Sequence, residues 1–303
     1  MKEAVAFAPC HITGLFQIFD QSAETLRAGS KGAGVCLGLG AKTTVKIRKG
    51  SKSSLKININ NHTADTAQVS KHVVSIFLSR FSETRNYEIV VEHHIGTPIG
   101  AGFGTSGAAA LSLALALNEA FDLGMTKIEA AQIAHTSEIE CKTGLGTVIA
   151  ETFGGFEIRI QPGAPGIGEV KRLPVPENTE VVCLTFGPLS TSKILTDKAT
   201  RTRINRFGGK LIDDLVEKPT IINFMKLSRQ FAEHVGLITE KVRSILDVMD
   251  QTGVVCSMPM FGESVFTVTC EEVEQILRVF RERGPNCHVI VSKVDSEGAR
   301  LLQ

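Results

Sequence analysis

The chain has 303 residues, of which 43% are hydrophobic and 21% charged, and its formal net charge is +1. This length accommodates one large domain or two of ordinary size, and the composition is that of a globular protein. A net charge so close to zero gives no electrostatic basis for binding nucleic acid, and no apolar stretch reaches the roughly 18 residues of a membrane-spanning helix, so we expect neither partner.

The first 160 residues alternate strand and helix patterns. The opening segment, MKEAVAFAPCHITG, is interrupted by Pro9 and His11, so we do not expect a secretory signal peptide. Runs rich in β-branched residues predict strands at residues 4–7, 43–48, 55–59, 88–95 and 156–160. Apolar periodicity predicts helices at residues 67–81, 107–121 and 127–141.

A turn-rich segment at residues 162–170, PGAPGIGEV, is the predicted domain junction. We therefore expect an N-terminal domain at residues 1–162 and a C-terminal domain at residues 163–303. In the second domain the pattern predicts helices and strands, the helices at 193–216, 221–235, 240–250 and 271–283, the strands at 181–186, 264–269 and 288–292. The β-α-β ending predicts an α+β, ferredoxin-like arrangement.

A glycine-rich loop, GTPIGAGFGTSG at residues 96–107, precedes the predicted helix at 107–121. Its alternating glycines permit positive φ and leave room for the close approach of a ligand. Thr105 or Ser106 is predicted to cap the helix. Because a helix N-terminus presents unpaired N–H groups and partial positive charge, it favours phosphate. The predicted phosphate-binding residues are Pro98, Gly100, Gly102, Gly104, Thr105, Ser106 and Gly107.

Other interpretations of this loop are weaker. Residues 102–107 fit the dinucleotide fingerprint G-x-G-x-x-G, but Pro98 separates them from the preceding strand. The acidic candidates Glu119 and Asp122 lie at the end of the helix rather than at the end of a strand. A Walker A loop is excluded because the sequence has no Gly-Lys-Ser/Thr, and the simplest alternative is a turn before a buried helix.

Three separated motifs resemble those of the GHMP kinases. The segment PIGAGFGTSGAAA resembles their phosphate-binding motif, APCHITGLF their first motif, and SMPMFGESVFTV their third. Within that superfamily, HITGLFQIFD and GSKGAGVCLGLG most resemble the archaeal pantoate kinases. The resemblance implies a two-domain α+β fold with ATP and Mg²⁺ in the interdomain cleft. It also implies phosphorylation of the terminal hydroxyl of pantoate to 4-phosphopantoate, on the route to coenzyme A.

The resemblance also suggests metal ligands. Mg²⁺ prefers oxygen ligands, so a carboxylate should hold it. The family position favours Glu138, which follows His135 at i+3 on one face of a predicted helix. The Ser106 hydroxyl would bind Mg²⁺ or a phosphate oxygen. The simpler alternatives are a solvated helical glutamate and a serine cap.

Pantoate carries a carboxylate, so basic side chains should contact it. Arg159 alternates with Glu157 on a predicted strand, and its planar guanidinium suits a carboxylate. Lys31 lies in the glycine-flanked GSKGAG, and His11 stands at the basic position of the first motif. With His135 these form the predicted substrate-binding set. The alternative for each is a surface charge or, for His11, a buried hydrogen-bonding side chain.

Two residues depart from the family pattern. Cys10 stands where the first motif has glycine, and Thr147 stands where many GHMP kinases carry an aspartate base. We still expect a working kinase in which Ser106, Glu138 and Thr147 are catalytic, because a loose transition state delays proton removal. The alternatives are a kinase of homoserine, mevalonate or a sugar, and a catalytically weak nucleotide or metabolite sensor.

Seven scattered cysteines without a C-x-x-C pair predict reduced thiols in the cytoplasm and no structural zinc. A homodimer is the candidate assembly.

Overall fold

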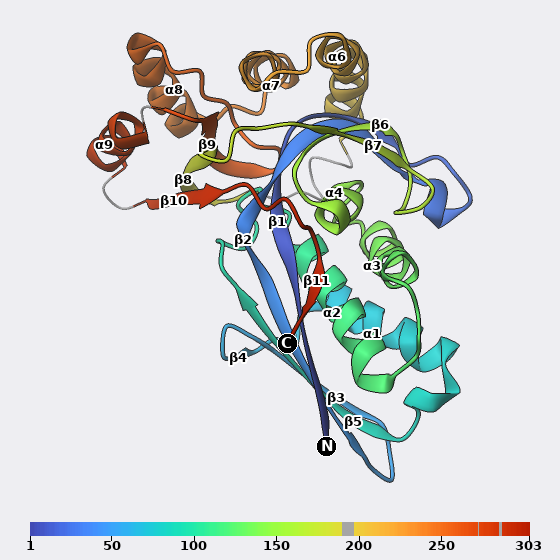
Figure 1. Cartoon of the computed structure of the whole chain (residues 1–303). Helices are drawn as coiled ribbons and strands as arrows, with labels where there is room; N and C mark the ends of the chain where they lie inside the picture. Colours follow the sequence, from blue (N-terminus) through green and yellow to red (C-terminus); the bar gives the residue numbers. More distant parts are fainter. Residues whose placement is uncertain (190–196, 272, 285–286) are drawn as a thin grey trace.

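The structure is a computed structural model that describes residues 1–189, 197–271, 273–284 and 287–303. Its frame is a long antiparallel hairpin of β1 (Lys2–Phe19) and β2 (Gly29–Lys49). In Figure 1 this hairpin runs from the end where the N-terminus lies up to the helices at the top of the view. The two strands therefore contribute to both layers of the molecule.

The hairpin belongs to an eight-stranded sheet with the order β11-β1-β2-β5-β3-β4, to which β6 and β7 are attached through β2. The other strands are β3 (Ser54–Ile59), β4 (His62–Thr63), β5 (Tyr87–Ile95), β6 (Phe156–Gln161), β7 (Glu169–Leu173) and β11 (Arg300–Leu302). β5 pairs with residues 41–49 of β2, and β6 pairs with residues 32–35. Two strands beyond residue 162, β7 and β11, thus join the first sheet, and the boundary at 162 stays a prediction.

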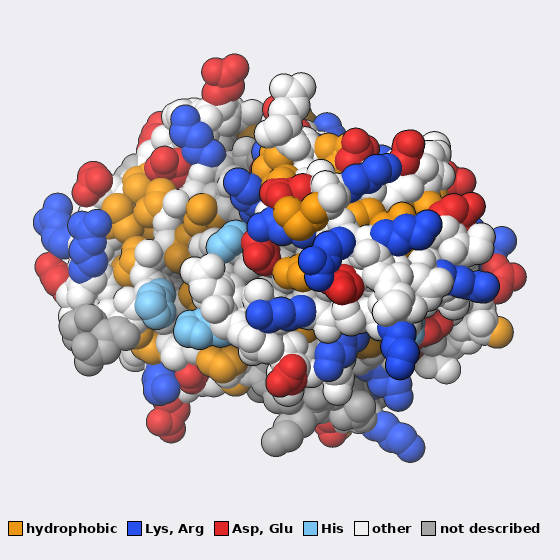
Figure 2. All heavy atoms as spheres, turned by 90° about the horizontal axis from the view of Figure 1, so that it is seen from below, with side chains coloured by type: hydrophobic (Ala, Val, Ile, Leu, Met, Phe, Trp, Pro, Cys, Tyr) orange, Lys and Arg blue, Asp and Glu red, His pale blue; other side chains and the backbone are white. Residues whose placement is uncertain are grey.

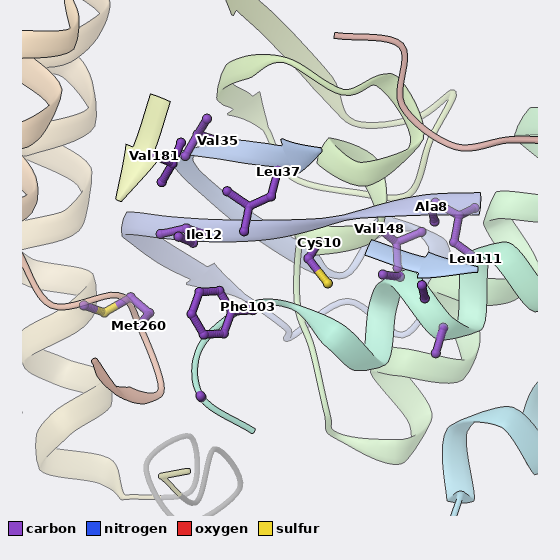
Figure 3. Close-up of a cluster of buried hydrophobic side chains, with 14 of the residues drawn as sticks. Ala8, Cys10, Ile12, Val35, Leu37, Phe103, Leu111, Val148, Val181 and Met260 are labelled. Atoms are coloured by element: carbon purple, nitrogen blue, oxygen red, sulfur yellow. The ribbon is translucent and has the colours of Figure 1, made fainter. Parts of the chain in front are cut away.

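Four helices pack near this sheet: α1 (Gln68–Arg80), α2 (Thr105–Phe121), α3 (Lys127–Cys141) and α4 (Thr147–Phe153). α2 is the innermost and contacts β1, β2, α1 and α3. Its sequence is apolar on nearly every side, which is the pattern of a helix buried all round. Figure 3 shows Leu111 of α2 and Val148 of α4 beside Ala8 of β1, all in the hydrophobic core.

The second layer is a three-stranded antiparallel sheet with helices. Its strands, in the order β10-β8-β9, are β8 (Glu180–Pro188), β9 (Gly262–Thr269) and β10 (His288–Lys293). The helices are α6 (Lys198–Glu217), α7 (Ile221–Val235), α8 (Glu240–Thr252) and α9 (Val273–Arg283). Short 3-10 helices are at Thr25–Arg27 and Ser82–Thr84. α6 and α7 also contact β1, so the layers meet on the hairpin. The α+β fold is confirmed.

The predicted helices at 67–81, 107–121, 127–141, 221–235 and 240–250 are confirmed to within two residues at each end. The start of the helix predicted at 193–216 lies outside the described residues. Residue 272 of the helix predicted at 271–283 also lies outside them. The strands predicted at 4–7 and 43–48 are much shorter than β1 and β2, to which they belong. Helix α4 was not predicted. Glycines disfavour strands, so the run at 29–40 was not recognised as part of β2.

The glycines of β2 make room for buried side chains. A Cβ at Gly34 would lie 2.4 Å from the His11 imidazole and 2.2 Å from the carbonyl oxygen of Ile12. A Cβ at Gly32, on the same face of the strand, would lie 2.5 Å from the Arg159 guanidinium. The glycine-rich sequence is therefore what allows His11 and Arg159 to lie against the strand.

On the face of the molecule seen in Figure 2, lysine and arginine side chains lie beside aspartate and glutamate side chains. This mixture agrees with the formal net charge of +1. Within the described part of the chain, no helix combines the length and the hydrophobicity that crossing a membrane requires.

We expect Gly34→Ala to lower the stability by about 1–3 kcal/mol, the usual cost of overpacking. Gly38→Ala is the matched control in the same strand, because Gly38 is exposed and its nearest neighbour would be 3.4 Å away. Thermal unfolding of both variants measures the difference. Equal melting temperatures would contradict the close contact at Gly34.

Candidate active site

A cavity of about 420 Å³ lies beside the glycine-rich loop. It is lined by β1, β2 and β6, by the loop and the start of α2, and by residues 141–147 between α3 and α4. Met260 and Phe261, just before β9, line the opposite side. Both layers therefore contribute to one cavity.

The loop has the backbone that its glycines predicted. Gly100, Gly102 and Gly104 have φ of 78°, 88° and 62°, in the left-handed region where glycine is favoured. The predicted cap was wrong: α2 begins at Thr105, its N-cap is Gly104, and no described side chain caps it. Ser106 instead turns its hydroxyl to another partner. The N–H groups of the first turn are thus left for an anion.

Contacts on both sides hold the loop in place. The N–H of His11 in β1 donates to the carbonyl oxygen of Phe103 over 3.0 Å, and Figure 3 shows the Phe103 ring next to β1, near Met260. From β9, the Ser264 hydroxyl donates to the carbonyl oxygen of Ala101 over 2.9 Å. A Cβ at Gly262 would lie 1.9 Å from that oxygen, so the third motif needs its glycine here.

A buried carboxyl group adjoins the start of α2. Glu138 of α3 is 3% exposed, and its Oε1 accepts hydrogen bonds from the hydroxyls of Ser106 and of Thr143, the second over 2.6 Å. Burial raises the pKa of Glu138, while these two hydrogen bonds oppose the rise. Glu138 therefore places carboxyl oxygens, which can act as metal ligands, inside the cavity and is not a solvated helical glutamate.

The cavity lining also includes a buried ion pair. Glu157 Oε1 accepts from Arg159 Nη1 over 2.6 Å and contacts His11 Nε2 at 2.8 Å. Burial lowers the pKa of His11 despite the opposing hydrogen bond from Glu157, so the imidazole is neutral at neutral pH. Arg159 is 1% exposed and lines the cavity, and its Nε has no hydrogen-bond partner among the described residues.

Most predicted site residues line this one cavity: His11, Gly100, Gly102, Gly104, Thr105, Ser106, Glu138, Thr147 and Arg159. Four predicted residues do not line it. Lys31 projects from the opposite face of β2 and lies 5.7 Å from the centre of the Phe19 ring. His135 is buried with its Nε2 3.0 Å from the carbonyl oxygen of Ala28.

Pro98 and Gly107 are the other two residues outside the lining. Gly107 is in the first turn of α2, where a Cβ would lie 2.6 Å from the Thr147 hydroxyl oxygen. It therefore serves the packing of α4 against α2 rather than the cavity surface.

Ser30 and Thr143 of the cavity lining, and Glu151 just behind it, were not predicted from the sequence. Ser30 lines the cavity from the face of β2 that also carries Gly32, whereas its neighbour Lys31 points the other way. Strand alternation would have favoured Ser30 over Lys31 if β2 had been recognised. No local signal marked Glu151, because its burial comes from the packing of α4 against α2, α3, β1 and β2.

Known proteins share this arrangement. Residues 68–155 match the family model of the GHMP kinases N terminal domain. A pantoate kinase from Methanocaldococcus jannaschii is 36% identical over 276 residues, which is 91% of this chain and 96% of that protein. This chain belongs to the pantoate kinases of the GHMP kinase family. A second pantoate kinase, from Thermococcus kodakarensis, is 34% identical and covers 88% of each chain.

Solved structures agree with the family. One described as a phosphotransferase related to the CoA biosynthesis pathway superposes with a TM-score of 0.89 and 31% identity, covering 99% of this chain and 98% of its own. Mevalonate diphosphate decarboxylase from Staphylococcus aureus has a TM-score of 0.74 at 14% identity, covering 100% of this chain and 98% of its own. The latter shows the shared GHMP kinase fold alone.

We expect Ser106→Ala to lower kcat at least tenfold while lowering stability by only about 1 kcal/mol, because Ser106 is not a helix cap. Its hydroxyl faces Glu138 in the cavity, so its loss affects the site more than the fold. Steady-state turnover and thermal unfolding measure the two effects. Ser79→Ala, an exposed helical serine, is the control. Normal turnover at saturating ATP would contradict the assignment.

Proposed function

We propose that this pantoate kinase family member transfers the γ-phosphoryl group of ATP to the terminal hydroxyl of pantoate. The observation that carries the proposal is one cavity whose lining includes both a helix N-terminus without a side-chain cap and a buried arginine. The first suits a phosphate and the second a carboxylate. The two pantoate kinases that cover about nine-tenths of the chain support this substrate.

The glycine-rich loop and the first turn of α2 would hold the phosphates. With no side-chain cap on α2, its N–H groups can donate to phosphate oxygens. The contacts of the loop to β1 and β9 keep these groups in place before the nucleotide arrives. Such preorganised donors stabilise the charge of the transition state without a reorganisation cost.

The oxygen atoms of Glu138 and Ser106 are of the kind that Mg²⁺ binds. The carboxyl group is buried in the cavity with the Ser106 hydroxyl beside it, and Mg²⁺ takes oxygen ligands. Among the described residues no cluster of three acidic, histidine or cysteine side chains could hold a metal. Mg²⁺ is commonly held by one or two carboxylates together with substrate phosphates and water. When bound, Mg²⁺ would neutralise the developing charge on the phosphates. Glu138 and Ser106 would hold it.

Arg159 would bind the pantoate carboxylate. Its Nε has a hydrogen to donate and no described acceptor, while Nη1 is engaged by Glu157. Ser30 and Thr13 also line the cavity and offer hydroxyls to the polar groups of the substrate. The neutral His11 orients Glu157 and adds no second charge. Arg159 and Glu157 cancel in net charge, so Arg159 would bind the carboxylate through the free N–H of its Nε rather than through a net positive charge.

Thr147 would orient the attacking hydroxyl. It is the first residue of α4 and lines the cavity next to residue 144, close to Glu138. A loose transition state needs little help from a base, so positioning supplies most of the acceleration.

We also propose a cytoplasmic location and a homodimer. All seven cysteines are free thiols, which supports a reducing compartment. Light scattering of the purified chain measures the assembly.

The purified chain should release ADP with pantoate and Mg-ATP at least tenfold faster than with homoserine, mevalonate or galactose. The reason is that Arg159 and the adjoining hydroxyls are placed for a hydroxy acid. A coupled ADP assay measures all four, with no acceptor as the control. If another acceptor is turned over faster, that acceptor and not pantoate is the substrate. If none of the four is turned over, the alternative of a nucleotide or metabolite sensor is favoured.

We expect Arg159→Lys to raise the KM for pantoate about tenfold and to leave the KM for ATP within about twofold. Lysine keeps the charge that Glu157 needs but lacks the donating Nε. One lost charge-assisted hydrogen bond is worth about 1.5–3 kcal/mol. Lys31→Ala is the control, since Lys31 does not line the cavity. An equal rise in both KM values would show that Arg159 faces ATP or is structural.

A further inference from the structure

A fully buried carboxyl group lies one helical turn beyond Thr147. Glu151 of α4 has no exposed surface, and neither of its carboxyl oxygens has a hydrogen-bond partner within the described part of the chain. Leaving a buried polar group unpaired costs about 1–3 kcal/mol, and more if it is charged. A residue kept at such a cost to stability points to a role in function.

Glu151 lies against the start of α2 and beside the Thr147 hydroxyl. The two residues are four apart on α4, so they share one side of the helix. Their side chains converge on Gly107, where a Cβ would lie 2.6 Å from Thr147 Oγ1 and 2.7 Å from Glu151 Oε2. Gly107 has no side chain to occupy the space between the hydroxyl and the carboxyl group, although no hydrogen bond joins the two in this structure. Thr147 reaches the cavity surface and Glu151 does not.

The groups around Glu151 set its acidity. Burial raises the pKa of Glu151 well above its usual range, Glu138 of α3 adds to the rise, and Arg159 of β6 opposes it. Cys10 of β1 and Cys36 of β2 also face it, and burial raises the pKa of both thiols, so they stay uncharged at neutral pH. In its ionised form a carboxylate of raised pKa is a stronger base than an exposed one.

We propose that Glu151 is the final proton acceptor of phosphoryl transfer, with the Thr147 hydroxyl as the relay between the substrate and this carboxylate. The inference rests on the proposed kinase function. The substrate oxygen forms a bond to the γ-phosphorus, and the bond to the bridging oxygen breaks with its electron pair leaving on ADP. The substrate proton passes to Thr147 Oγ1 as the Thr147 proton passes to Glu151. Glu151 returns its proton to solvent after product release.

A double-mutant cycle tests the relay. Thr147→Val removes the hydroxyl, and Glu151→Gln removes the acceptor with little change in shape. Each should lower kcat about tenfold, at the low end for general base catalysis with a loose transition state. The double variant should also lose only about tenfold, because both changes break the same path. The KM values for pantoate and ATP should stay within about twofold. A double variant that loses about 100-fold would overturn the relay.

A rescue experiment separates the relay from a structural role. Adding Thr147→Asp to Glu151→Gln places a carboxylate at the cavity surface and should restore kcat to within about threefold of the unmodified chain. A purely structural defect at Glu151 would not be restored. Thr147→Ser keeps the hydroxyl and should retain a higher kcat than Thr147→Val. If it loses as much as Thr147→Val, or if the rescue fails, the proposal is wrong.

Two further measurements keep the test decisive. Thermal unfolding shows whether each variant is folded. If Glu151→Gln does not fold, Glu151→Asp is tested in its place. This variant keeps a carboxyl group and should retain a higher kcat than Thr147→Val. The unmodified chain is assayed first with pantoate. No turnover there contradicts the proposed function, whereas normal turnover with independent variants contradicts only the relay.

Discussion

The burial of His11, Glu157 and Arg159 where β1, β2 and β6 meet is the constraint on which the rest of the site depends. Removing an ion pair from water is expensive, and good hydrogen-bond geometry is needed to offset the cost. The 2.6 Å and 2.8 Å contacts to Glu157 Oε1 supply that geometry. They also require two glycines in β2, since any side chain there would occupy the space of the imidazole and the guanidinium.

The same hairpin contacts both the proposed phosphate loop and the residues proposed to bind the substrate. β1 carries His11, whose backbone N–H holds Phe103 of the loop, and Thr13, whose carbonyl oxygen accepts from the N–H of Met260. The groups proposed to contact the two reactants are therefore attached to one pair of strands rather than to separate loops. Such a frame keeps catalytic distances fixed when the elements around it move.

Much of the site could be predicted because its signals are local. Positive φ at alternating glycines and the strand alternation of Arg159 with Glu157 follow from short stretches of sequence. The rest depends on contacts distant in sequence. The glycines of β2 hide a strand, so Lys31 was chosen over Ser30. Glu151 looks like an ordinary helical glutamate until α2 and the segment before β11 cover α4.

The pairing of β11 with β1 bears on how the chain is made. Val5, at the start of the sequence, pairs with Leu302, and the N–H of Asp295 donates to the carbonyl oxygen of Cys36. During synthesis, the outer edge of β1 has no strand beside it until β11 has left the ribosome. An open strand edge is a template for pairing with other chains. Aggregation of nascent chains should therefore depend on how soon β11 follows β1, and slow translation of the segment between them would expose this edge for longer.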